Sequence, residues 1–293
     1  MNHLQKNIKF YIVLFLVPSI LGYIIFSLLP MLSAFYLSFT SWDIIGGTPD
    51  WIGITNYKDI FSSDEFYRVL KNTLKFIVMY IPLIMISSFL LALLFDQKVK
   101  GVGAFRVLLF IPVLTSWVAG SIIWRSALNG QYGIINNLLD LVGIQGPGWL
   151  TDPKWSMVSI VMVSIWKDLG FFSLIIFGAL RNVDKEVYEA AEIDGASSFK
   201  KTLKITLPLV SPTLFFVLIT TMINSFQLFP QVMVMTGGGP FGSTQVLVER
   251  IYTYGFRYFN MGYAAALSIV LLIMIVIVTI IQLVFQKKWV FYE

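Results

Sequence analysis

Six long apolar stretches constrain the fold of this chain more than any other feature of its sequence. They cover residues 10–32, 76–95, 107–124, 157–180, 209–235 and 261–286. A helix needs about 20 predominantly apolar residues to cross the hydrocarbon core of a bilayer. Because each stretch reaches or approaches this length, we predict an all-α integral membrane protein. Its six transmembrane helices would form one domain covering residues 1–293.

Composition excludes several classes of soluble protein. The chain is 57% hydrophobic and 13% charged, whereas soluble domains carry about 25% charged residues. It has no cysteine, and its only histidine is His3. Disulfides, thiolate metal sites and the usual general base are therefore excluded, so we predict neither a catalytic residue nor a metal site. The net charge of +5 does not indicate nucleic-acid binding, because the charges lie in short segments between the apolar stretches.

Basic residues set the expected orientation, because cytoplasmic loops carry an excess of Lys and Arg near helix ends. One side of the predicted topology holds 12 such residues and the other holds 8. The richer side contains Lys6, Lys9, Lys98, Lys100, Arg106, Arg181, Lys185, Lys200, Lys201, Lys204, Lys287 and Lys288. We expect this side to be cytoplasmic. With six helices, both termini then lie in the cytoplasm.

Residues 181–208 form a charged segment between the fourth and fifth predicted helices, with five acidic and five basic residues. Asp184 and Glu186 suit the first turn of a helix, and Gly195 suits a change of direction at its end. Ser197 or Ser198 can then begin a second helix. Spacing alone leaves two interpretations open, an amphipathic hairpin at the membrane surface and a docking element for a cytoplasmic partner. The small residues beside Gly195 favour docking, because they allow close approach of another protein.

The same segment carries a long gapped motif. Glu189-Ala190-Ala191 is followed after three residues by Gly195, and after nine more by Ile205-x-Leu207-Pro208. This pattern resembles the "EAA" signature of permease subunits of ABC importers. The resemblance implies the type I importer architecture and a coupling helix that sits in a cleft of the ATPase subunit. It assigns the coupling role to Glu189, Ala190, Ala191, Asp194 and Gly195.

Three further stretches resemble the maltose-permease-like carbohydrate branch of that family. They are Asn72-Thr73, Thr236-Gly237-Gly238-Gly239-Pro240 and Gly262-Tyr263-Ala264-Ala265-Ala266. The resemblance implies a multi-pass protein of a prokaryotic cytoplasmic (inner) membrane. It also implies three kinds of partner: a second homologous permease, two ATPase subunits and an extracytoplasmic solute-binding protein. The chain has no G-x-x-x-x-G-K-[ST] motif, so we expect no cofactor on this chain, with ATP and Mg bound by the ATPase partner.

Helix five should carry a polar stripe. Thr220, Asn224, Gln227 and Gln231 are spaced four, three and four residues apart, so on one continuous helix they would share a face. Amides within the bilayer need partners, so the stripe should face the protein interior or a wet cavity. It could either hold helices together or line a pathway for a sugar rich in hydroxyl groups. Thr221 and Ser225 beside it occupy positions similar to sugar-contacting ones in maltose-type permeases.

Helix four contains adjacent charges, Lys167 and Asp168. Neighbours on a helix lie about 100° apart, which prevents an ideal mutual pair, so at least one should find a partner elsewhere. Positions like Ser164, Asp168 and Phe171 line the substrate site in the resembling family. There Asp168 would accept sugar hydroxyls and Phe171 would stack on a sugar ring. The alternative for Asp168 is a structural ion pair across the permease interface. Trp117 is a further stacking candidate, or simple packing.

These observations predict a permease subunit that moves a carbohydrate, an oligosaccharide or modified sugar, across the membrane by alternating access. Lipid and carbohydrate are the expected non-protein partners. The alternative is a secondary transporter or channel for a small polar solute. That class would need ion-coupling carboxylates within the membrane or helices broken near its midplane.

Overall fold

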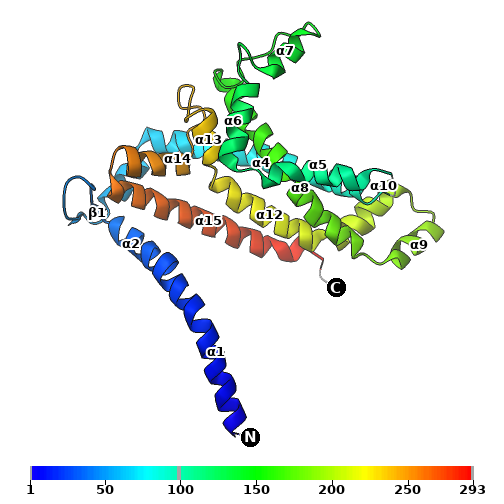
Figure 1. Cartoon of the computed structure of the whole chain (residues 1–293), viewed down its shortest axis with the longest axis horizontal. Helices are drawn as coiled ribbons and strands as arrows, with labels where there is room; N and C mark the ends of the chain where they lie inside the picture. Colours follow the sequence, from blue (N-terminus) through cyan, green and yellow to red (C-terminus); the bar gives the residue numbers. More distant parts are fainter. Residues whose placement is uncertain (1, 98–99, 292–293) are drawn as a thin grey trace. The chain divides into compact units, whose positions relative to one another are not determined.

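A computed structural model describes residues 2–97 and 100–291 and is mostly helical (Figure 1). Lys98, one of the basic residues used to predict orientation, lies outside the described residues. The chain divides into two compact units. The first combines Met1–Ser63 with Ile251–Leu272, and the second combines Asp64–Arg250 with Ile273–Glu293.

The first unit begins with a long apolar helical run. Helix α1 (Asn2–Tyr23) passes through a π-helical turn, η1 (Ile24–Leu28), into α2 (Leu29–Leu37). Short strands β1 (Thr40–Ser41) and β2 (Asp50–Trp51) pair antiparallel and precede α3 (Thr55–Ser62). The π-helical η3 (Thr253–Arg257) and the start of α15 (Met261–Trp289) complete this unit.

A close backbone approach joins the two chain segments of the first unit. The backbone N–H groups of Met261 and Gly262 both donate to Trp42 O, at 2.9 and 3.1 Å. A Cβ atom at Gly262 would lie 2.0 Å from Thr40 O. Only glycine therefore allows the start of α15 to lie so near the β1 segment.

The second unit is a helical bundle around α4 (Asp64–Phe95) and α8 (Pro153–Arg181), which pack against each other. Helix α5 (Val102–Leu114) packs on α8, and α12 (Ser211–Phe226) packs on both α4 and α8. Buried apolar side chains such as Phe76, Ile84 and Ile176 fill the spaces between these helices.

Shorter helices of the second unit complete its ends. They are α6 (Trp117–Ala127), α7 (Ile134–Asp140), α9 (Lys185–Ile193), α10 (Ser198–Lys201), η2 (Thr202–Thr206), α11 (Leu207–Leu209) and α13 (Pro230–Met235). Helix α14 (Leu247–Tyr252) begins in the second unit and ends in the first. Helix α6 packs against α13.

Four uninterrupted helical runs of the described chain are long and apolar enough to span a membrane. They cover Tyr11–Leu37, Asp64–Phe95, Pro153–Arg181 and Met261–Trp289. Two further spans arise if each bent pair of helices counts as one. The predicted helices at 10–32, 76–95, 157–180 and 261–286 are thus present, with longer ends.

The prediction of one continuous third helix at 107–124 was wrong. Helices α5 and α6 meet at an angle of 102°. Thr115 and Ser116 have extended backbones, and the Ser116 side chain accepts a hydrogen bond from Ala119 N to begin α6. Apolar composition alone did not reveal this break, which depends on a serine cap.

The fifth predicted helix at 209–235 is also interrupted. Helix α12 ends at Phe226, and α13 begins at Pro230 after three non-helical residues. A residue before proline is disfavoured in the helical region, and Phe229 has φ −147° and ψ −62°. A further bend of 69° separates the Ser198–Leu209 helical run from α12.

Candidate functional site

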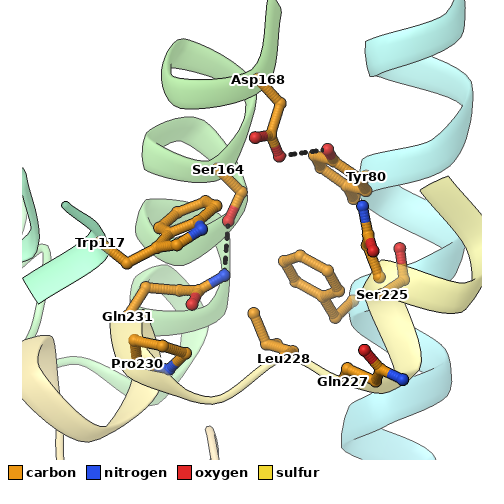
Figure 2. A pocket seen from close by; sticks show the side chains of 11 residues that line it. Tyr80, Trp117, Ser164, Asp168, Ser225, Gln227, Leu228, Pro230 and Gln231 are labelled. Atoms are coloured by element: carbon orange, nitrogen blue, oxygen red, sulfur yellow. Dashed lines mark hydrogen bonds between the residues drawn. The ribbon is translucent and has the colours of Figure 1, made fainter. Parts of the chain in front are cut away.

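A polar cavity of about 310 Å³ opens within the helical bundle of the second unit, between α4, α8, α6, α12 and α13 (Figure 2). Three aromatic side chains line it: Phe76, Tyr80 and Trp117. The polar lining consists of Ser164, Asp168, Asn224, Ser225, Gln227 and Gln231, and the remaining lining residues are Leu228 and Pro230. The cavity therefore offers ring faces, amides and hydroxyls together with one carboxylate.

The carboxylate is held from the opposite side of the cavity. Tyr80 of α4 donates its hydroxyl proton to Asp168 Oδ2 at 2.7 Å (Figure 2). The Tyr80 ring stacks on Phe76, one helical turn earlier, with centroids 5.2 Å apart. Since one carboxylate oxygen accepts from Tyr80, the other can accept a hydrogen bond from a molecule in the cavity.

A second polar contact joins α13 to α8 across the cavity. Gln231 Nε2 donates to Ser164 Oγ at 3.4 Å, while Ser164 donates to Ile160 O at 2.8 Å (Figure 2). Gln231 is buried, with 5% of its surface exposed. Its Oε1 atom has no hydrogen-bond partner among the described residues. A buried unpaired acceptor is costly, so this atom is suited to accept a hydroxyl from a bound ligand.

Lys167, next to Asp168 in sequence, points to a different neighbour. Its Nζ atom donates to Pro112 O and Val113 O, both at 2.9 Å. These carbonyls belong to the last turn of α5, where the intrahelical partners end. Lys167 Nζ also lies 5.3 Å from the Trp117 ring centre. The lysine therefore stabilises the break between α5 and α6 and contacts the aromatic side chain that lines the cavity.

The second candidate site is the charged segment between α8 and α12, which contains α9 and α10. Helix α9 ends in a glycine motif, with Gly195 at φ +72°. Ala196 N donates to Ala191 O at 2.9 Å, and Gly195 N donates to Glu192 O at 3.0 Å. These two bonds define a Schellman C-cap, which reverses the chain direction after α9.

Two side-chain bonds attach α9 to the helical run that follows it. Tyr188 and Thr206 share a hydrogen bond of 3.1 Å between their hydroxyls. Lys201 Nζ lies 2.7 Å from Glu192 Oε1. The hydrogen bond and the positive charge of Lys201 hold the pKa of the Glu192 carboxyl below its ordinary value. The face of α9 that carries Tyr188 and Glu192 is thus used within the chain.

Most of the chain matches a known family of transport proteins. A family model described as binding-protein-dependent transport system inner membrane component matches residues 74–290. The chain belongs to this family. It is a multi-pass membrane permease, and it has the type I importer fold.

Individual relatives agree with this assignment. The permease is 34% identical to the probable ABC transporter permease protein YesP of Bacillus subtilis (strain 168), over 95% of this chain and 91% of the relative. It is 34% identical to the lactose transport system permease protein LacF of Rhizobium radiobacter, over 92% and 91%.

A solved structure shows the same fold. It is a bacterial alginate ABC transporter in complex with alginate pentasaccharide-bound periplasmic protein, with a TM-score of 0.87. The match covers 98% of each chain at 23% identity. The two breaks in the helices of the permease therefore occur within an importer fold and do not require the secondary-transporter alternative.

Six of the eight predicted pathway residues of the permease line the single cavity described above. They are Trp117, Ser164, Asp168, Asn224, Ser225 and Gln227. Phe171 and Thr221 do not line it. Thr221 is fully buried and donates to Val217 O at 2.8 Å, and Phe171 packs edge-on against Phe172 with a ring distance of 5.3 Å. Contact between any of these residues and substrate stays a prediction.

Three of the four residues in the polar stripe predicted on helix five, Asn224, Gln227 and Gln231, line the cavity, but the stripe is not continuous. Gln231 lies on α13, beyond the interruption, and Thr220 donates to Phe216 O at 2.9 Å outside the cavity lining. Sequence reasoning missed Tyr80 and Phe76, which come from α4. Their one-turn spacing gave no signal, because only packing brings α4 opposite Asp168.

The predicted coupling residues of the permease divide between two environments. Glu189, Ala190, Asp194 and Gly195 are exposed. Ala191 is buried with 8% exposure, so it packs within the chain, and its coupling role stays a prediction. Ile193 was not singled out from the sequence, although it is 88% exposed. The outward face of α9 therefore consists of Glu186, Glu189, Ala190 and Ile193, which follow helical spacing.

Proposed function

We propose that this permease carries a carbohydrate, an oligosaccharide or modified sugar, through the cavity around Asp168. The cavity is the observation that carries the proposal, because it places a carboxylate, three amides and aromatic rings inside a membrane helix bundle. Such groups suit a sugar, whose hydroxyls need hydrogen-bond partners and whose ring faces suit aromatic side chains. The lactose permease relative supports the choice of a carbohydrate.

The permease would not hydrolyse ATP. We infer that two separate ATPase subunits bind ATP and Mg, and that they contact the outward face of α9. This face consists of Glu186, Glu189, Ala190 and Ile193, and the exposed Gly195 turn follows it. The contacts of Tyr188 and Glu192 attach α9 to the helical run that leads to α12, so we expect the two to move together. Motion at α9 would thereby reach the cavity, which α12 lines.

The remaining assembly follows from the family. We propose one further homologous permease, an extracytoplasmic solute-binding protein and a prokaryotic cytoplasmic membrane, with both termini of this chain in the cytoplasm. Relatives of known structure include a complex with a periplasmic protein, which supports the binding-protein partner. The two compact units would act as a single permease domain over residues 1–293. Access to the cavity would alternate between the two sides of the membrane.

Uptake by reconstituted transporter tests this function. The tagged permease would be purified with its companions from native membranes and placed in liposomes containing Mg and ATP. Radiolabelled lactose and arabino-oligosaccharides serve as probes, with the binding protein added outside. We expect uptake of at least one saccharide, and its loss when ATP is replaced by ADP. Uptake that persists with ADP would contradict the proposal, as would purification without an ATPase.

Asp168→Asn separates a pathway role from a structural one. The substitution keeps the size of the side chain and an oxygen that can accept from Tyr80. We expect uptake to fall by about tenfold, which corresponds to roughly 1.4 kcal/mol, while the companions still co-purify. Lys154→Met, an exposed change in the first turn of the same helix, is the matched control. Loss of co-purification with Asp168→Asn would instead favour an interface ion pair.

A further inference from the structure

The charge of the cavity distinguishes among carbohydrates. Among its described lining residues, Asp168 alone carries a formal charge. Every other polar side-chain group there is an amide, a hydroxyl or the indole N–H of Trp117, all of them neutral. Amides and hydroxyls can serve neutral and charged sugars alike, so the carboxylate decides the charge preference of the surface that this chain contributes.

Three basic side chains on α5, α6 and α8 make their contacts outside the cavity. Lys167 directs its ammonium to Pro112 O and Val113 O on α5. Arg125 of α6 donates to Val234 O at 3.3 Å. Arg106 donates to Phe95 O and lies over the Phe177 ring, 4.2 Å from its centre. None of these three residues lines the cavity, and no other Lys or Arg in residues 2–97 and 100–291 does so. The described part of the chain therefore offers no cation there to bind a carboxylate, sulfonate or phosphate.

The position of Asp168 strengthens this preference. Its Oδ2 atom is fixed by Tyr80, so the carboxylate cannot simply rotate out of the cavity. Repulsion between two like charges is screened less in a partly buried cavity than in water. An anionic sugar would therefore meet an unfavourable carboxylate, whereas a neutral sugar could donate a hydroxyl to it and an amino sugar could form a charge-assisted bond.

We propose that this permease admits neutral or amino sugars and rejects acidic ones such as uronates, sulfonated sugars and sugar phosphates. The inference rests on the proposed function, because it takes the cavity as part of the sugar pathway. Fold similarity does not show whether the permease prefers neutral or acidic sugars, since it shares its fold with a transporter of the acidic polysaccharide alginate. The distinction comes from the cavity lining of this chain.

The absence of cysteine in the chain allows the cavity charge to be measured without knowing the sugar. Asn224 lines the cavity and is exposed. An Asn224→Cys variant in the purified, full transporter would react with methanethiosulfonate reagents of similar size, one cationic and one anionic. The labelling rates on this chain would be followed by mass spectrometry, and the ratio of cationic to anionic rate would be compared with and without Asp168→Asn.

We expect Asp168→Asn to lower that ratio by about fivefold or more, because the substitution removes the negative potential. Tyr80→Phe is the matched control, since it removes the hydrogen bond to Asp168 but keeps the charge, and its ratio should stay close to the starting value. Ser126→Cys, nine residues along α6 from Trp117, should show no change with Asp168→Asn. If Asp168→Asn leaves the ratio at position 224 unchanged, the proposal is overturned. A cation from the second permease that neutralises Asp168 would give this same result, and the proposal would fail in that case too.

A transport measurement completes the test. A saccharide that the reconstituted transporter takes up is compared with its C6-oxidised uronate, with rates corrected for affinity to the binding protein. We expect the uronate to enter at least about tenfold more slowly, and Asp168→Asn to narrow the difference. Equal rates would overturn the charge preference. Failure to import any saccharide would count against the proposed function, while the labelling ratio would still measure the cavity charge.

Discussion

Lys167 and Asp168 are consecutive residues of α8, yet their side chains join two different helices. Lys167 donates to the carbonyls of Pro112 and Val113 on α5, and Asp168 accepts from Tyr80 on α4. The sequence predicted that the two would not form an ideal pair and that at least one would find a partner elsewhere. Both do, so α8 fixes the α5–α6 break with one residue and presents a carboxylate to the cavity with the next.

Removal of the Lys167 ammonium should destabilise this break. Lys167→Met keeps most of the apolar stem but removes the side-chain donor to Val113 O. Pro112 O loses one donor as well, although it still accepts from the backbone and the hydroxyl of Thr115. A buried unsatisfied carbonyl costs about 1–3 kcal/mol. We expect a clear drop in the thermal unfolding midpoint of the purified complex and faster proteolysis at Thr115–Ser116. Lys154→Met should change neither quantity, and equal sensitivity of both variants would refute the capping role.

Gly170 should tolerate no side chain, because α8 and α5 meet there backbone to backbone. A Cβ atom at this position would lie 2.0 Å from Leu109 O. Gly170→Ala must therefore push the helices apart, which we expect to cost about 1–3 kcal/mol. Gly178→Ala is the matched control on the same helix, since no atom lies within 4 Å of its Cβ position. Comparison of the two unfolding midpoints tests the expectation, and a harmless Gly170→Ala would show that the helices can separate freely.

Gly195 should be constrained by backbone conformation and not by space. Its φ of +72° lies in the left-handed region, and no atom lies within 4 Å of its Cβ position. Gly195→Ala should therefore cost about 1–2 kcal/mol locally, and Gly195→Asn less, because asparagine adopts this conformation more readily. We expect Gly195→Ala to reduce uptake per ATP hydrolysed more than Gly195→Asn does. The reverse order would indicate that side-chain volume at the ATPase contact decides the effect.

The ion pair between Glu192 and Lys201 predicts how the α9–α10 connection depends on pH. Because the pKa of Glu192 is lowered in the folded protein from 4.5, its contribution is fully present above that ordinary value. The contribution is lost as the pH falls through the lowered pKa. Hydrogen exchange in residues 185–201 should thus be insensitive to pH near neutrality, after correction for intrinsic rates, and should increase in acid.

Glu192→Gln is the control for this pH dependence, since it retains a hydrogen-bond acceptor without the charge. It should remove the acid-induced increase in exchange and reduce the effect of salt, which screens an exposed ion pair. If the variant shows the same acid response as the unmodified permease, another group is responsible. Glu189→Gln, which leaves the pair intact, should retain the response.

Helical spacing in the sequence predicted some of the residues that line the cavity, but not all of them. Ser164 and Asp168 lie one turn apart on α8, so helical periodicity placed them on a shared face. The same periodicity grouped Asn224 on α12 with Gln227, which lies just beyond the end of that helix, and both residues line the cavity. Periodicity could not show that Tyr80 faces Asp168, because that contact joins positions 88 residues apart. It also gave the wrong account of Gln231, whose position depends on where α12 stops.

The sequence by itself determined the membrane-embedded helical class, the shared face of Ser164 and Asp168 and the glycine-terminated α9, since each follows from local hydropathy, spacing or capping. Tertiary structure alone decided that α5 and α6 form a bent pair, that Ala191 is buried and that Tyr80 and Gln231 complete the cavity. These outcomes arise from packing between distant segments. A hydrophobic stretch predicts that a segment lies in an apolar environment. Which backbone groups still need hydrogen-bond partners, and which side chains come into contact, depends on the segments packed against it.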